Sequence, residues 1–156
     1  MVPTMRRKRL TDAPCPIARG LDEVGEWWSL LILRDAMRGL TRFDEFQRSI
    51  GLATNMLTRR LQALVGAGLL EKRPYQERPL RYGYHLTDKG RDFLPVLIAM
   101  ADWGRRWLLP SGAFELVDRE TGRIVEPVLV DRSTGEPIQP DRLRAEMTIP
   151  EKEEME

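Results

Sequence analysis

Apolar residues recur at helical spacing through the first two thirds of the chain, which predicts a succession of short helices. The first covers residues 15–24. The second, Trp27–Met37, is apolar around most of its circumference, so we expect it to be buried. A third follows at residues 43–50 with a single apolar stripe, and Thr41 is its expected N-cap.

A fourth helix is predicted from a cap at Thr54 to about Gly66, after a tight connection at residues 51–53. At about 100° per residue, its leucines fall in one arc and its polar residues in the opposite arc. The polar face consists of Thr54, Asn55, Thr58, Arg59 and Gln62. Arg, Asn and Gln can make paired hydrogen bonds to base edges, so the third and fourth helices are typical of a helix-turn-helix. An ordinary amphipathic surface helix explains this segment alone equally well.

Two strands are predicted next, at residues 69–75 and 80–86, with a turn-rich link between them. Residues 41–81 hold 8 basic and 4 acidic residues. A basic hairpin directly after a helix-turn-helix is typical of a winged helix, whose surplus charge lies along the phosphate backbone of a duplex. The expected wing and backbone contacts are Arg42, Lys72, Arg73, Arg78 and Arg81.

A long helix is predicted after Thr87, which caps it, and Pro95 is expected to kink it. Large apolar residues step along this helix by three and four positions, which is the spacing of helices that pair. Such a stripe needs burial, and we expect a second copy of the chain to cover it. The predicted dimer interface comprises Phe93, Met100, Trp103 and Trp107.

Charge is divided unevenly along the chain. The 156 residues include 25 Lys or Arg and 24 Asp or Glu, for a formal net charge of +1. Residues 1–110 hold 19 basic and 12 acidic residues, net +7, whereas residues 111–156 hold 6 and 12, net −6. A basic body with an acidic appendage indicates a module that binds a polyanion. Residues 1–14 are expected to form a flexible basic arm.

The composition also argues against several classes of protein. The apolar runs of the body are too short to cross a membrane, and the first residues lack the apolar stretch of a secretory signal. The single cysteine excludes an internal disulfide and a thiolate-rich zinc site. Without a phosphate-binding loop or a nucleophile elbow, no enzymatic activity is expected, and neither is a cofactor or a metal. We therefore expect a soluble cytoplasmic protein.

The acidic appendage contains an internal repeat. Residues 116–122 (LVDRETG) return as residues 129–135 (LVDRSTG), each copy a short apolar strand followed by a polar turn. We expect two successive β-hairpins over residues 111–140. Residues 141–156 are strongly charged and are expected to be disordered at their end.

The order of motifs along the body resembles that of the HxlR-type winged-helix regulators, which are related to the MarR group. The segments that carry the resemblance are residues 15–18 (CPIA), 25–35 (GEWWSLLILRD), 42–46 (RFDEF), 57–61 (LTRRL), 68–71 (GLLE), 84–90 (YHLTDKG) and 103–104 (WG). The resemblance implies a mainly α fold with a small β part, in which residues 15–110 form a winged helix-turn-helix with helical dimerisation elements.

The resemblance also implies a homodimeric transcriptional regulator that binds double-stranded DNA at a pseudo-palindromic operator. Thr54, Asn55, Thr58 and Arg59 would face the major groove, and the wing would contribute Arg78 and Arg81. We expect a repressor rather than an activator, and its effector, a small molecule or an oxidant, is left open. The alternative is a dimeric adaptor that binds proteins through a winged-helix scaffold.

The resemblance also bears on Cys15 and on the acidic appendage. Some family members sense oxidants through a cysteine at the position of Cys15, although a small apolar role at the dimer interface is favoured over sensing. The appendage is similar to the zinc-ribbon-like tail of other members. Thr121 and Thr134 stand where that tail has cysteines, so no zinc is expected.

Overall fold

The computed structural model describes residues 13–146, so most of the predicted basic arm and the end of the charged tail lie outside the described residues. Contacts divide the chain into two units. One unit is Glu23–Pro127, and the other contains the described residues up to Asp22 and from Val128 onward. The domain boundaries expected at residues 14, 110 and 140 remain predictions.

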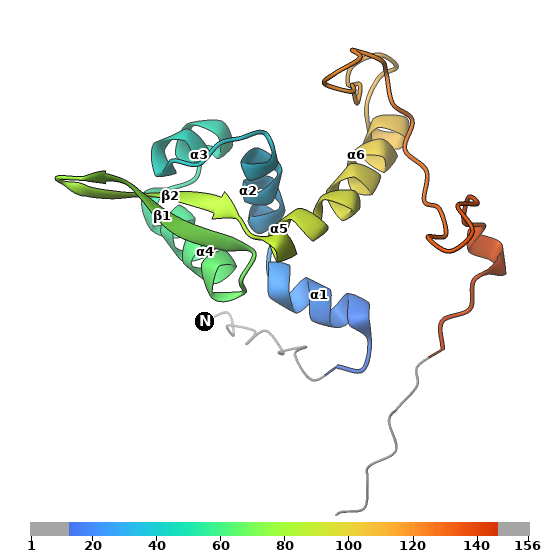
Figure 1. Ribbon diagram of the computed structural model, residues 1–156, viewed down its shortest axis with the longest axis horizontal. Helices are drawn as coiled ribbons and strands as arrows, with labels where there is room; N and C mark the ends of the chain where they lie inside the picture. Colours follow the sequence, from blue (N-terminus) through green and yellow to red (C-terminus); the bar gives the residue numbers. More distant parts are fainter. Residues whose placement is uncertain (1–12, 147–156) are drawn as a thin grey trace, which may run out of the picture. The chain divides into compact units, whose positions relative to one another are not determined.

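The larger unit is a winged helix, as predicted: mainly α-helical, with one antiparallel hairpin that extends past α3 and α4 in Figure 1. Its elements are α2 (Trp27–Met37), α3 (Phe43–Ile50), α4 (Thr54–Gly66), β1 (Leu70–Glu77), β2 (Leu80–Leu86), α5 (Asp88–Asp92) and α6 (Leu94–Leu108). Helix α1 (Pro16–Val24) precedes them and spans the boundary between the units. Within residues 13–146, no helix combines the length and apolar character that crossing a bilayer requires.

The core lies between α2, α3, α4 and the base of the hairpin. Its buried apolar side chains are Val24, Ile32, Leu33, Phe46, Leu52, Leu57, Leu61, Leu64, Leu69 and Leu70. Helix α2 is buried because it is apolar on several sides, and its one acidic core residue, Asp35, is paired with Arg34 and Arg38 at 2.9 and 3.5 Å. The paired charge lowers the cost of burying this carboxylate.

The start of α3 differs from the prediction by one residue. Its N-cap is Arg42, not Thr41. The open backbone N–H groups at this end are satisfied by the side chain of Glu45 from inside the helix, and not by a threonine hydroxyl. The Glu45 carboxylate accepts hydrogen bonds from the backbone N–H groups of Thr41 and Arg42, both at 2.9 Å. A carboxylate in the first turn satisfies donors that the helix leaves open and complements its dipole.

The hairpin is longer than predicted, since β1 continues to Glu77. The register pairs Leu70 with Leu86 at the base and shifts between Pro74 and Gln76, which leaves Tyr75 without an opposite residue. An extra residue of this kind is a β-bulge, which bends the strand and redirects its side chains.

The predicted long helix after Thr87 is two helices in the structure. Thr87 does act as a cap, since its hydroxyl accepts from the Gly90 N–H at 3.1 Å, but the helix that it caps, α5, ends at Asp92. A new helix, α6, begins after Phe93 with Pro95 in its first turn, where proline is tolerated. The expectation of a single helix kinked at Pro95 was therefore wrong.

Gly90 permits the close approach of α5 to the hairpin. A Cβ atom at this position would lie 2.2 Å from the Leu69 carbonyl oxygen, a contact that no side chain can make. The same carbonyl accepts from the Thr87 N–H at 3.2 Å, so α5 is held directly against the start of the hairpin.

Each copy of the repeat forms a tight turn closed by a single β-bridge, Val117–Ile124 in one unit and Val130–Pro137 in the other. In the first turn the Asp118 carboxylate accepts from the N–H and the hydroxyl of Thr121, at 2.7 and 2.8 Å. These bonds lower the pKa of Asp118. The polar Asp and Thr side chains therefore close the turn by hydrogen bonding.

Candidate nucleic-acid interface

Helix α4 presents one polar face to solvent. Its buried side carries three leucines of the core, which fixes the rotation of the helix about its own axis. On the opposite side, four of the five predicted recognition residues are exposed and Thr58 is half-buried: Thr54, Asn55, Thr58, Arg59 and Gln62. The structure thus brings the predicted recognition residues together on one accessible surface.

The first residue of that face is held by the preceding helix. The sequence predicted Thr54 as the N-cap of α4, but the N-cap is Ala53 and Thr54 is already helical. Its hydroxyl instead accepts from Gln47 Nε2 at 3.0 Å, and the same nitrogen lies 3.4 Å from the Leu52 carbonyl oxygen. Gln47, which was not among the predicted site residues, therefore links α3 to α4 across the turn.

Two adjacent arginines of α4 have different environments. Arg59 is exposed, and its side chain makes no hydrogen bond or ion pair with any residue of the described part of the chain. Arg60 is largely buried and its guanidinium lies 2.5 Å from the Glu26 carboxylate. Only Arg59 has both its charge and its donors available to a ligand.

The basic residues of the hairpin also separate into two kinds. Arg78 and Arg81 are exposed at its turn and pair with no carboxylate among residues 13–146. Arg73 pairs with Glu71, whose Oε1 accepts from Arg73 Nε at 2.9 Å. We therefore assign the unbalanced charge of the hairpin to Arg78, Arg81 and Lys72, which likewise pairs with no carboxylate among the described residues, and not to Arg73.

Arg42 is fixed beside the hairpin by its backbone. It forms a β-bridge with Gly83, and the Tyr84 N–H donates to the Thr41 carbonyl at 2.7 Å. The backbone N–H groups of Arg42 and Thr41 lower the pKa of Glu45, which holds this segment from the other side. Arg42 thus stands where α3 and the hairpin meet.

Two cations of the interface lie over aromatic rings. The Arg42 guanidinium is 4.8 Å from the centroid of the Tyr75 ring. Lys72 Nζ is 5.9 Å from the centroid of Tyr82 and 5.8 Å from that of Tyr84, close to the distance at which such attraction fades. The sequence did not predict these contacts, because each cation and its ring are far apart along the chain.

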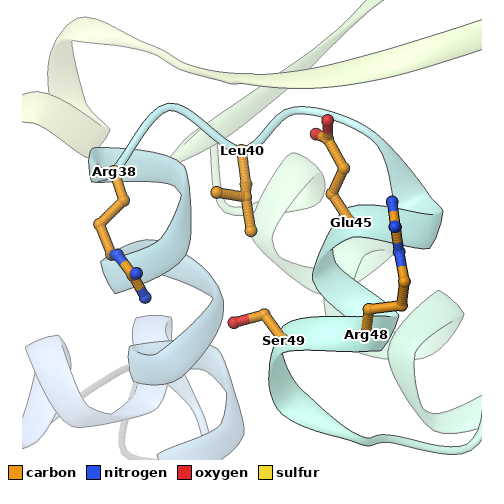
Figure 2. Close-up of a pocket in the computed structure, with 5 residues that line it drawn as sticks. All are labelled: Arg38, Leu40, Glu45, Arg48 and Ser49. Carbon is orange, nitrogen blue, oxygen red and sulfur yellow. The ribbon is translucent and has the colours of Figure 1, made fainter.

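A pocket of about 400 Å³ lies between α2 and α3 (Figure 2). In Figure 2 the Ser49 hydroxyl points across it toward Arg38, while Glu45 points to the loop that precedes α3. Its two arginines are already paired, Arg38 with Asp35 and Arg48 with Asp44 at 3.1 Å. The pocket is open but carries little unbalanced positive charge, unlike the hairpin.

The predicted interface residues of α6 do not share one environment. Phe93 is half-buried and packs against the core of its own chain, so it is not free for a partner. Met100, Trp103 and Trp107 are 50%, 52% and 72% exposed. Between them Asp102 is buried and binds Arg105 at 2.8 Å. The accessible apolar stripe is therefore the later part of the predicted one.

Cys15 lies immediately before α1 and is half-buried. Its carbonyl accepts from the Arg19 N–H at 3.1 Å. The Arg19 guanidinium donates to the Ala13 carbonyl at 2.6 Å. Among residues 13–146, no group of three or more His, Cys, Asp or Glu is arranged to hold a metal.

Comparison with known proteins agrees with this geometry. Residues 23–111 match the family model described as HxlR-like helix-turn-helix. The uncharacterized HTH-type transcriptional regulator Rv3095 of Mycobacterium tuberculosis is 37% identical over 124 residues, 78% of each chain. The crystal structure of the candidate transcription factor PA1607 superposes with a TM-score of 0.81 at 40% identity, covering 90% of this chain and all of that one. The redox regulator HypR, in its reduced form, covers 59% of this chain and 92% of its own with a TM-score of 0.56 at 30% identity.

Proposed function

Because the chain belongs to the HxlR-like helix-turn-helix family, we propose that it binds a pseudo-palindromic operator as a homodimer and represses transcription from it. Its relatives are transcriptional regulators and not enzymes, and a regulator of this family has DNA as its partner. The observation that carries the proposal is the exposed polar face of α4, with Arg59 unpaired at its centre. A protein adaptor would have no need of this face.

The arrangement of charge supports the same reading. A recognition helix in the major groove places Arg and Asn side chains against base edges, where a bidentate contact discriminates between bases. Arg78 and Arg81, unpaired at the tip of the hairpin, would then meet phosphates of the adjacent backbone. Each phosphate whose charge is neutralised by a basic side chain releases condensed counterions, so the affinity for DNA should fall steeply as the salt concentration rises.

The proposal of a dimer is based on the exposed apolar stripe formed by Met100, Trp103 and Trp107. A solitary chain would leave these large side chains in water, and a two-fold axis through paired helices would bury both copies of the stripe. Two recognition helices related by such an axis read half-sites about one helical turn, roughly 34–36 Å, apart.

The signal that releases the regulator from DNA is a separate hypothesis. HypR is a redox regulator, and oxidation of Cys15 is one candidate; a small molecule is the other. A gel-shift titration with and without a quinone or peroxide, on this protein and on Cys15→Ser, separates them. Release from DNA that Cys15→Ser abolishes would support oxidation as the signal. Identical titration curves for both proteins, with and without oxidant, would eliminate it.

As a regulator that works on the chromosome, the protein is expected in the cytoplasm.

The DNA-binding proposal is tested by selecting bound fragments from the source genome and titrating the enriched duplex. We expect Arg59→Ala to weaken binding to this duplex about 5- to 150-fold, the range for one lost bidentate base contact. Arg59→Lys should keep much of the affinity for random duplex while losing preference for the enriched one, because a lysine lacks the planar fork of an arginine.

Arg119→Ala is the matched control, since it removes the same charge from an exposed position in the appendage. It should bind the enriched duplex like the unaltered protein. If no duplex is bound at low salt, or if Arg59→Ala and Arg119→Ala behave alike, the proposal fails and the adaptor alternative is favoured.

A further inference from the structure

The pair formed by Arg42 and Tyr75 has features that simple surface proximity does not explain. Tyr75 is the bulged residue of β1: Pro74 pairs with Tyr82 and Gln76 with Arg81, so nothing stands opposite Tyr75. A bulge re-aims the side chain of the extra residue. Here the redirected ring lies beneath a guanidinium that comes from outside the hairpin, 4.8 Å from its centroid.

The backbone at Arg42 is held at several points, which limits where its side chain can start. The bridge to Gly83 joins it to β2, and the Glu45 carboxylate binds its N–H at 2.9 Å. The neighbouring Thr41 is bonded on both sides, through its N–H to Glu45 and through its carbonyl to the Tyr84 N–H. Only the rotatable bonds of the Arg42 side chain remain free.

Gly83 of β2 connects the segment of Arg42 to β1. Gly83 pairs with Arg42 on one side and with Arg73 of β1 on the other, and Tyr75 follows Arg73 by two residues along β1. Gly83 thus lies between the arginine and the tyrosine. A Cβ on Gly83 would lie 3.0 Å from His85 Nε2 and 3.5 Å from the Thr41 carbonyl oxygen, so a side chain here would crowd the His85 ring and touch the backbone just before Arg42.

The mode of contact decides what Arg42 can still bind. A cation over an aromatic ring uses the face of the guanidinium, whereas a carboxylate uses its in-plane N–H donors and cancels its charge. No ion pair of Arg42 occurs among residues 13–146, in contrast to Arg73 with Glu71. Stacking therefore orders the Arg42 side chain while leaving its donors and charge for an anion.

We propose that Tyr75 is a positioning residue for DNA binding: its ring holds the Arg42 guanidinium in place to contact a backbone phosphate at the junction of α3 and the wing. This rests on the proposed function. The pocket of about 460 Å³ lined by Phe43, Asp44, Tyr75, Arg81 and Tyr82 leaves room beside the pair for that backbone. Tyr75 acts through Arg42 and makes no essential contact with DNA itself.

The test is a double-mutant cycle on binding to the enriched duplex. Tyr75→Leu should weaken binding about two- to fivefold, the range for one exposed cation–π contact, and Tyr75→Phe should bind like the unaltered protein. Arg42→Ala should lower the slope of log affinity against log salt by about one. In the Arg42→Ala background, Tyr75→Leu should have no further effect.

Lys72→Ala provides the matched background, because Lys72 lies near other tyrosines of the same hairpin. There Tyr75→Leu should keep its full two- to fivefold effect. An equal loss in the Arg42→Ala background would show that the ring contacts DNA directly and would overturn the inference. So would unaltered binding by Tyr75→Leu.

A measurement without DNA keeps the inference testable if a variant binds poorly for another reason. The Arg42 Nε–Hε signal in a ¹H–¹⁵N NMR spectrum should carry a ring-current shift that Tyr75→Leu removes and Tyr75→Phe retains. Absence of that shift would overturn the pairing itself. If the unaltered protein bound no duplex, the proposed function would fail, whereas duplex binding with an additive cycle would defeat this inference alone.

Discussion

Arg59 and Arg60 are neighbours in α4, yet only one of them is available to a ligand. Arg60 points into the molecule, where its guanidinium meets Glu26 and its Nε is buried without a partner. Arg59, one residue earlier and about 100° around the helix, faces solvent. At the residue scale, then, the direction of the side chain decides whether a charge contributes to the interface or to the fold.

Glu45 offers a test of how the wing junction is held. Its lowered pKa means that the folded state favours the carboxylate, so its contribution to stability is present above the ordinary glutamate pKa of about 4.3 and is lost as pH falls through the lower folded value. We expect Glu45→Gln to reduce the free energy of unfolding by about 1 kcal/mol at pH 7, as for a lost N-terminal cap. The difference between the two proteins should shrink below about pH 4.

Urea unfolding at pH 7 and at several values below pH 4 measures this difference. Glu77→Gln is the control, because the Glu77 side chain is exposed in the same unit and forms no hydrogen bond or ion pair with another described residue. It should unfold like the unaltered protein at each pH. A Glu45→Gln penalty that stays constant across this range would contradict the assigned role of the charge.

At the scale of the element, α6 changes along its length from packing on its own chain to exposing its apolar stripe. Its beginning is tied to the body by Phe93 and Leu97, which pack on the core. Farther along, Asp102 is buried and pairs with Arg105 and Arg106, and the hydrogen bond to Asp102 raises the pKa of Arg105. Beyond Leu97 the same apolar stripe is exposed, an arrangement that suits a helix with a partner.

We therefore predict that Trp103→Glu combined with Trp107→Glu converts the proposed dimer to a monomer. Buried tryptophans of this kind each contribute about 2 kcal/mol or more to an interface. Loss of one such contact should raise the dissociation constant about thirtyfold, and loss of both should raise it further. Sedimentation at micromolar concentration measures it. Leu80→Glu, an equally abrupt change at an exposed apolar position of the hairpin, should leave the dimer intact.

At the scale of the whole molecule, the net charge is close to zero, although positive and negative charges lie in different parts of the chain. The net +1 is the sum of a basic body and an acidic appendage. Acidic residues close to a bound duplex would oppose binding, so we expect the appendage to lie away from the DNA. At physiological salt, charges beyond about 8 Å from the phosphates are largely screened.

Removing residues 128–156, which hold 4 basic and 8 acidic residues, tests this expectation. The cut follows the boundary between the two units, so the winged helix and the first copy of the repeat stay together. We predict an affinity for the enriched duplex within about twofold of the full chain at 0.15 M salt, with the same salt slope. A marked gain in affinity at low salt that vanishes at high salt would place the acidic residues near the phosphates.

The sequence alone located most of the helices and the polar face of α4 that we propose binds DNA. Helical periodicity located α2 and α4, and it separated Thr54, Arg59 and their neighbours from the leucines of the core, because each position on a helix faces a direction set by its number. Local chemistry likewise identified Thr87 as a cap, although it could not show that the chain breaks again at Phe93.

Only the tertiary structure decided which side chains are free and which are engaged. Gln47 reaches Thr54, Glu45 holds the residues before its own helix, and Phe93 turns into the core. Arg73 is balanced by Glu71, whereas Arg42 stacks on Tyr75 and keeps its charge unpaired. Periodicity assigns a residue to a face of its own element, but a partner on another element depends on distances that only packing determines.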